Sequence, residues 1–110
     1  MPNPIESLTQ EIVAFRDARD WRQFHNPKDL ALALSIEAAE LNELFLWKAH
    51  ESVDASGVRE ELADVIIYAL LIVHHYGLSV EHIVREKLEI NAKRYPQELS
   101  RGSARKYDQL

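Results

Sequence analysis

Apolar positions recur with a helical period along most of the chain. Glycines and prolines divide the chain into segments long enough for helices, and no stretch shows the strict alternation of a half-buried strand. The pattern predicts four helices, over about 4–19, 27–48, 58–76 and 80–95. We therefore expect an all-α fold, a four-helix bundle in one domain that spans residues 1–110.

Capping residues mark the ends of these segments. Asn3 is placed to form a capping box with Glu6 at the start of the first helix. Asn26 precedes the second helix and, like Asn3, is followed by a proline. Gly77 is expected to end the third helix in a left-handed conformation. The polar segments at 50–57 and 97–110 predict a loop and a tail that extends over the surface or a neighbouring chain.

Composition and charge narrow the class of protein. The chain is 46% hydrophobic, enough for a core, and its 13 basic and 18 acidic residues give a formal charge of −5. Binding to nucleic-acid polymers or anionic membranes depends on clustered basic residues, so we expect neither partner. The lack of cysteine excludes thiolate sites and fits a reducing cytoplasm, and we expect no signal peptide.

Carboxylates interrupt two apolar helix faces. Glu37 falls inside the apolar arc of the second predicted helix, and Glu40 lies at the edge of that arc. The third helix is apolar nearly all round, except for a narrow stripe that holds Glu61, Asp64 and Tyr68. Carboxylates at i and i+3 point the same way, so two antiparallel helices would bring all four together.

Such a cluster needs a cation. Two unit charges ~4 Å apart repel by roughly 4 kcal/mol at an effective dielectric near 20. Oxygen ligands without thiolates favour Mg²⁺ or Mn²⁺, and Mg²⁺ often takes substrate phosphates as further ligands. Glu40, at the edge of the arc, is the candidate for orienting or deprotonating an attacking water. The alternative is that both carboxylate pairs belong to ordinary solvated helix faces.

Two further groups of residues would suit a nucleotide. Lys87, Asn91 and Arg94 form one stripe on the fourth helix, where cationic and amide donors could hold phosphates. Aromatic rings at Trp21 and Trp47 could stack on a base. Each group has a structural alternative. The basic side chains could simply interact favourably with the negative end of the helix dipole, and the tryptophans could simply anchor the core.

The residues that carry these patterns also resemble a known family. EAAELNELFLWK at 37–48 and EELADVIIY at 60–68 are similar to the ExxE and ExxD motifs of the MazG-like nucleotide pyrophosphohydrolases. KLEINAKRYP at 87–96, RDWRQFH at 19–25 and GSARKY at 102–107 resemble the dCTP pyrophosphatase branch of that family. The resemblance covers nearly the whole chain.

The resemblance implies a homo-oligomer, dimeric or tetrameric, that hydrolyses a nucleoside triphosphate to the monophosphate and pyrophosphate with Mg²⁺. dCTP or a modified dCTP is the first expected substrate, as in the cleansing of nucleotide pools. The implied metal ligands are Glu37, Glu40, Glu61 and Asp64. The implied phosphate-binding residues are Lys87, Asn91, Arg94 and Tyr95. The implied base pocket holds Trp21, His25 and Trp47, with Tyr68 next to the metal site.

Two other interpretations stay open from the sequence. The first is a helical interaction or regulatory module without catalysis, whose carboxylates are only solvated. The second is a di-iron carboxylate bundle, although neither helix supplies the histidine three residues after a glutamate that such bundles use. The oligomer has independent support, because a helix that is apolar nearly all round needs more cover than three other helices easily provide.

Overall fold

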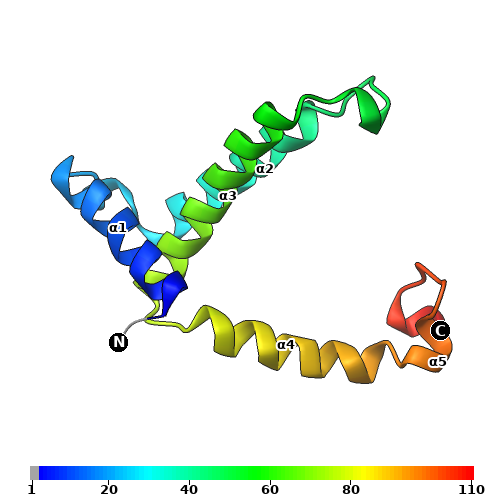
Figure 1. Ribbon diagram of the computed structural model, residues 1–110. Helices are drawn as coiled ribbons and strands as arrows, with labels where there is room; N and C mark the ends of the chain where they lie inside the picture. Colours follow the sequence, from blue (N-terminus) through cyan, green and yellow to red (C-terminus); the bar gives the residue numbers. More distant parts are fainter. Residues whose placement is uncertain (1–2) are drawn as a thin grey trace. The chain divides into compact units, whose positions relative to one another are not determined.

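The fold is all-helical. The computed structural model describes residues 3–110 and contains five α-helices, three short 3-10 turns and no strand within them (Figure 1). The helices are α1 (Pro4–Ala18), α2 (Pro27–Glu43), α3 (Ala55–His75), α4 (Val80–Arg94) and α5 (Gln97–Ser100). The all-α class is thus confirmed. The chain divides into two compact units, Met1–Gly77 and Leu78–Leu110, and the single domain stays a prediction.

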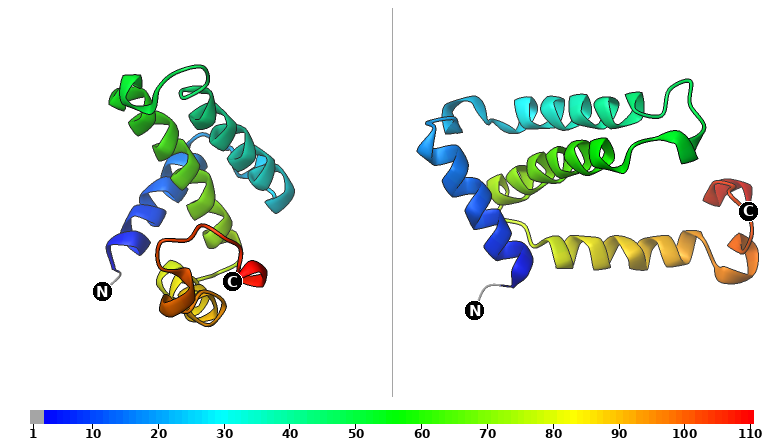
Figure 2. Two further views of the ribbon diagram at one scale, coloured as in Figure 1. Left: turned by 90° about the vertical axis from the view of Figure 1, so that its right-hand side faces the viewer. Right: turned by 45° about the horizontal axis from the view of Figure 1, so that its top comes forward.

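The first unit is built on the pair α2 and α3. The two helices run antiparallel and side by side, and α1 packs against α3 (Figure 2). Leu30, Leu70 and Leu71 are the buried apolar side chains of this unit, at 1%, 6% and 2% exposure. Such a small core leaves many large apolar side chains of α2 and α3 exposed, among them Leu32 and Ile66.

The predicted caps are confirmed. Asn3 Oδ1 accepts from the backbone N–H of Glu6 at 2.9 Å, while the Glu6 carboxylate accepts from the N–H of Asn3, which completes the capping box. Asn26 caps α2 in the same way, accepting from the N–H of Asp29 at 2.9 Å. Gly77 has φ +62°, the left-handed conformation expected after α3.

The turn between α2 and α3 differs from the prediction. α2 ends at Glu43 rather than near residue 48, because the following residues make i to i+3 hydrogen bonds and Trp47 takes a left-handed φ of 64° to reverse the chain. α3 begins three residues early, at Ala55, because Asp54 accepts from the N–H of Ser56 at 3.0 Å. The connection between α2 and α3 therefore runs over 44–54, so the predicted loop at 50–57 was too short and lay too late in the chain.

The second unit contains α4 and a folded tail. Ser79 caps α4 as predicted, accepting from the N–H of His82. The tail is not a simple extension: it forms α5 and a 3-10 turn at its end. The tail packs on the end of α4, since the Arg94 guanidinium lies 4.8 Å from the Tyr107 ring centroid and Tyr95 meets the same ring edge to face. The sequence predicted four helices, and the short α5 is a fifth that it did not predict.

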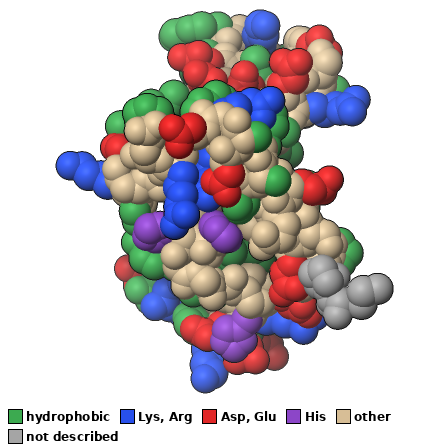
Figure 3. Space-filling view, turned by 90° about the vertical axis from the view of Figure 1, so that its left-hand side faces the viewer, with side chains coloured by type: hydrophobic (Ala, Val, Ile, Leu, Met, Phe, Trp, Pro, Cys, Tyr) green, Lys and Arg blue, Asp and Glu red, His purple; other side chains and the backbone are tan. Residues whose placement is uncertain are grey.

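The surface carries both signs of charge. On the face drawn in Figure 3, lysine and arginine side chains are interspersed with acidic and hydrophobic ones. Within the described part of the chain no helix is by itself long and apolar enough to cross a membrane, and α3 and α4 pass that test of length and composition only as a pair.

Candidate functional site

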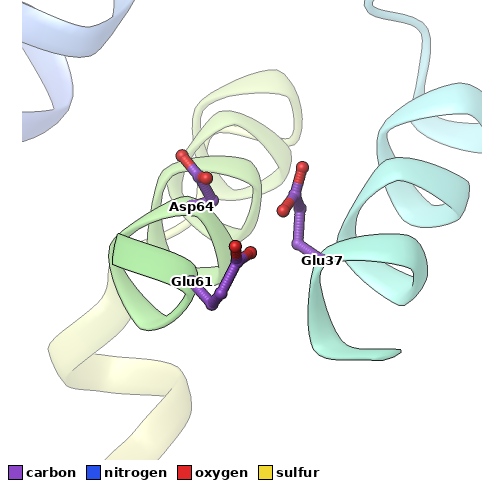
Figure 4. Close-up of side chains that lie close together, drawn as sticks. All are labelled: Glu37, Glu61 and Asp64. Atoms are coloured by element: carbon purple, nitrogen blue, oxygen red, sulfur yellow. The ribbon is translucent and has the colours of Figure 1, made fainter. Parts of the chain in front are cut away.

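Three carboxylates meet between α2 and α3. Glu37 projects from α2 toward Glu61 and Asp64 of α3, and each offers an oxygen within 4.8 Å of the others (Figure 4). The i to i+3 spacing on α3 aims two of these side chains the same way, and the antiparallel packing brings the third to meet them. We call these three residues the carboxylate cluster.

The cluster holds its carboxylates in an unfavourable charge environment. The pKa of Glu37 is raised from its ordinary 4.5 to about 7, first by burial, then by the neighbouring Glu40 carboxyl and the charge of Asp64. The pKa of Glu61 is also raised, by burial and by Glu40. Ionising all of them at neutral pH therefore calls for a compensating positive charge.

A divalent cation fits the cluster. Oε2 of Glu37 and Oε2 of Glu61 are buried and have no hydrogen-bond partner. Among residues 3–110 the ion pairs lie elsewhere, so no basic side chain neutralises the three carboxylates. The donors are all carboxylate oxygens, the ligands of hard divalent ions, and no histidine joins them as a di-iron bundle would require.

Glu40 lies beside the cluster rather than in it. It is more exposed than the other three predicted ligands. It is nevertheless close enough to raise the pKa of both Glu37 and Glu61. This position matches the edge of the apolar arc, where the sequence placed it.

A second, apolar pocket of about 320 Å³ is lined in part by Tyr68. Its walls are the inner face of α1, the turn before α2 and the middle of α3. The Tyr68 and His25 rings meet edge to face there, with centroids 6.3 Å apart. We call this the aromatic pocket. Its size and apolar walls suit a small flat ligand.

Tyr68 joins the two regions. Its ring lines the aromatic pocket, one helical turn along α3 from Asp64. Its hydroxyl has a raised pKa, caused first by burial and then by the charges of Glu37 and Asp64. The aromatic pocket therefore opens within the electrostatic reach of the carboxylate cluster.

His25 is a neutral side chain in this pocket. Burial and the nearby Arg16 charge both lower its pKa below the ordinary 6.5, so the imidazole is uncharged at neutral pH. Its Nδ1 is buried without a hydrogen-bond partner. A buried, unpaired ring nitrogen is a polar group that a ligand could satisfy.

The two tryptophans have different surroundings. Trp21 lines the aromatic pocket and packs edge to face on Phe15. Trp47 is 100% exposed, and its left-handed backbone is unusual for a bulky residue. α2 separates Trp47 from His25, and its length is about 25 Å at 1.5 Å per residue. One chain therefore does not bring both tryptophans to one pocket.

The predicted phosphate-binding residues lie in the second unit. Asn91 and Tyr95 are half-buried, whereas Lys87 and Arg94 are exposed. Arg94 stacks on Tyr107, which holds its side chain along the end of α4. Whether this stripe faces the carboxylate cluster stays a prediction.

The contribution of α1 was missed by the sequence reasoning. Leu8, Ile12 and Phe15 line the aromatic pocket, as does the buried Arg16. The i, i+4, i+7 spacing of the three apolar residues was a readable signal, but it predicts core packing equally well.

Comparisons with known proteins identify the family of the chain. A model of the MazG-like family matches residues 32–110. The dCTP pyrophosphatase 1 proteins of Rattus norvegicus and Homo sapiens are 39% and 38% identical over 118 aligned residues, which cover 99% of this chain and 69% of each relative. A crystal structure of a pyrophosphatase from Archaeoglobus fulgidus matches with a TM-score of 0.80 at 36% identity, covering 87% of this chain and 95% of that one. The chain therefore belongs to the MazG-like family, as its motifs predicted, and is a hydrolase of the nucleotide pyrophosphatase type.

Proposed function

We propose that the protein hydrolyses dCTP, or a base-modified dCTP, to the monophosphate and pyrophosphate with Mg²⁺. The observation that carries the proposal is the adjacency of the carboxylate cluster and the aromatic pocket across Tyr68. A nucleotide has the same two parts, a polyanion that needs a metal and a flat base that needs an apolar slot. Cytosine is assigned through the relatives, whose printed name is dCTP pyrophosphatase 1.

Each part of the site has a separate task. Glu37, Glu61 and Asp64 would hold Mg²⁺, which supplies charge neutralisation at the phosphates and activation of water. Glu40, exposed beside them, would orient the attacking water or take its proton. Trp21 and His25 would hold the base, so that the triphosphate extends past Tyr68 toward the cluster.

The basic stripe on α4 would bind the leaving pyrophosphate. Lys87 and Arg94 supply positive charge, and Asn91 supplies an amide donor. Tyr95 supports this end of the helix through its contact with Tyr107. These contacts would neutralise charge that develops on the β-phosphate as the bond to the α-phosphorus breaks.

The working unit would be a homo-oligomer. Exposed apolar residues along α2 and α3 form a surface that a second copy could cover, and the small core of the first unit leaves it available. Trp47, fully exposed at the end of α2 away from His25, would close the base pocket of a neighbouring copy. Clearance of unwanted nucleotides from the cytoplasm is the matching cellular role.

Pyrophosphate release from a panel of the common ribo- and deoxynucleoside triphosphates tests the activity. The proposal expects release with Mg²⁺, highest for dCTP, and none with EDTA. Release that is equal with Mg²⁺ and EDTA, or absent for every nucleotide, would contradict it.

Mixing two impaired variants tests the shared pocket. In a hybrid of Trp47→Ala and Asp64→Asn chains, one site takes its cluster from the first chain and its tryptophan from the second, and both are intact. At a dCTP concentration well below KM, we expect co-refolded mixtures to recover activity above that of either variant alone. No recovery in mixtures shown to be hybrid would place Trp47 outside the site.

A further inference from the structure

Arg16 is a buried cation in a pocket that is otherwise mostly apolar. Its residue exposure is 7%, although the neighbouring Asp17 on α1 is exposed. Burying a guanidinium is costly unless it is paired and hydrogen-bonded. The one carboxylate that pairs with it within residues 3–110, Asp17, is itself 49% exposed. Packing alone does not explain a charge at this position.

The pairing uses only part of the guanidinium. Nε of Arg16 donates to Oδ1 of Asp17 at 3.0 Å, and Nη2 forms an ion pair with the same oxygen at 2.9 Å. A guanidinium carries five N–H donors in a planar fork. The far end of the guanidinium carries two parallel donors, one on Nη1 and the second N–H of Nη2. Among the side-chain hydrogen bonds of residues 3–110, these two donors have no protein acceptor.

We propose that Arg16 reads the base, donating from this end of its fork to N3 and O2 of cytosine. The inference rests on the proposed function, because it assigns the aromatic pocket to the nucleobase. Trp21 and His25 line the same pocket, so a ring held there lies within the walls that Arg16 completes. Arg16 is then a residue that determines specificity rather than a part of the carboxylate cluster.

The chemistry of the pyrimidines makes this contact selective. Cytosine presents two adjacent acceptors, N3 and O2, which match two parallel donors. Thymine and uracil carry a hydrogen on N3, so a donor would face a donor there. A buried site built for hydrogen bonds discriminates strongly against a ligand that leaves its groups unpaired.

The test compares dCTP with dTTP, which differ only in the base. Arg16→Met keeps the unbranched stem of the side chain and removes the guanidinium with its donors, and the partner Asp17 is left half-exposed rather than buried without its cation. Arg16→Lys keeps the charge but replaces the fork by a single point. Arg19→Met is the matched control, because Arg19 lies on the Phe15 ring of the same helix and outside the pocket walls.

Wild-type protein should prefer dCTP. Arg16→Met should lower kcat/KM for dCTP by about 10- to 100-fold, the range of one bidentate contact, and leave dTTP nearly unchanged. Arg16→Lys should lose most of the same preference, and Arg19→Met should keep it. Parallel loss for both nucleotides, or an unchanged ratio, would overturn the role of Arg16. A wild type active on both pyrimidines alike would do so too, yet leave the pyrophosphohydrolase proposal intact.

Discussion

The carboxylate cluster and the aromatic pocket lie within two helical turns of each other on α3, yet they are opposite environments. Glu61 and Asp64 bring repelling charges to Glu37, whereas Tyr68 contributes a ring to walls that are mostly apolar. The cluster is unfavourable as it stands and gains from a cation. The pocket gains from a flat ligand that displaces water.

This contrast shows how one helix can select a composite ligand. Under the proposed function, a metal alone would satisfy the cluster and a base alone would satisfy the pocket, but only a metal-bound nucleotide would satisfy both. Changes in the cluster should therefore affect the rate of chemistry, and changes in the pocket should affect the binding of the base. The predictions below separate these two effects.

Asp64→Asn should have the largest effect. It removes a ligand charge from the cluster while keeping the shape of the side chain, so turnover should fall by at least ~100-fold with the fold intact. Steady-state kinetics and circular dichroism check both parts. Glu60→Gln, the exposed neighbour of Glu61 outside the cluster, is the control and should retain activity. Unchanged turnover of Asp64→Asn would remove this residue from the site.

Trp21→Ala should act on binding instead. Loss of a stacking ring should raise KM for dCTP by roughly 10- to 100-fold and change kcat little. Phe24→Ala is the matched control, since Phe24 lies in the same turn, is 62% exposed and does not line the pocket. A fall in kcat at constant KM would contradict the division between the two regions.

Stability of the metal-free protein should depend on pH through Glu37. Its pKa is about 7 in the fold and 4.5 ordinarily, so the folded state holds the proton more tightly than the unfolded state. The resulting stability is complete below the ordinary value and is lost as the pH rises through about 7. In EDTA the melting temperature should thus fall by several degrees from pH 5 to pH 8.

Two additions sharpen that measurement. Mg²⁺ at pH 8 should raise the melting temperature again, because a cation that binds only the folded state stabilises it. Glu37→Gln should flatten the dependence on pH, since the residue no longer ionises. A wild-type melting temperature that is constant from pH 5 to pH 8 in EDTA would show that Glu37 is not perturbed.

Asn26→Ala should have the smallest effect and no bearing on chemistry. It removes the cap of α2 and should cost about 1 kcal/mol, or ~4 °C in melting temperature. The value of kcat and the Mg²⁺ requirement should stay as in the wild type. Asn42→Ala, exposed within α2, should change stability by less than ~0.5 kcal/mol. A loss of the Mg²⁺ requirement would mean that the cap and the cluster are coupled.

The sequence predicted those parts of the fold that depend on local chemistry. Asn3, Asn26 and Gly77 mark helix ends because caps and left-handed glycines act within a few residues. The end of α2 was not predicted, because the left-handed turn at Trp47 serves the reversal that brings α3 alongside. That reversal is a tertiary requirement with no glycine to mark it.

The candidate site also has a part that the sequence predicts and a part that only the structure reveals. The sequence predicts the meeting of Glu37, Glu61 and Asp64, because charged residues in apolar faces are visible in a helical period. It does not reveal that α1 forms a wall of the aromatic pocket, since an apolar stripe also predicts core packing. Arg16 escaped notice because an arginine on a helix is ordinarily exposed, and only the structure shows that it is buried.

The most direct test of the account is the product and metal balance of dCTP turnover. Purified protein should convert dCTP to dCMP and pyrophosphate in equal amounts with Mg²⁺, and conversion should stop when EDTA removes the ion. Conversion that continues in EDTA, or release of inorganic phosphate with dCDP, would contradict a carboxylate-held cation acting at the α-phosphorus.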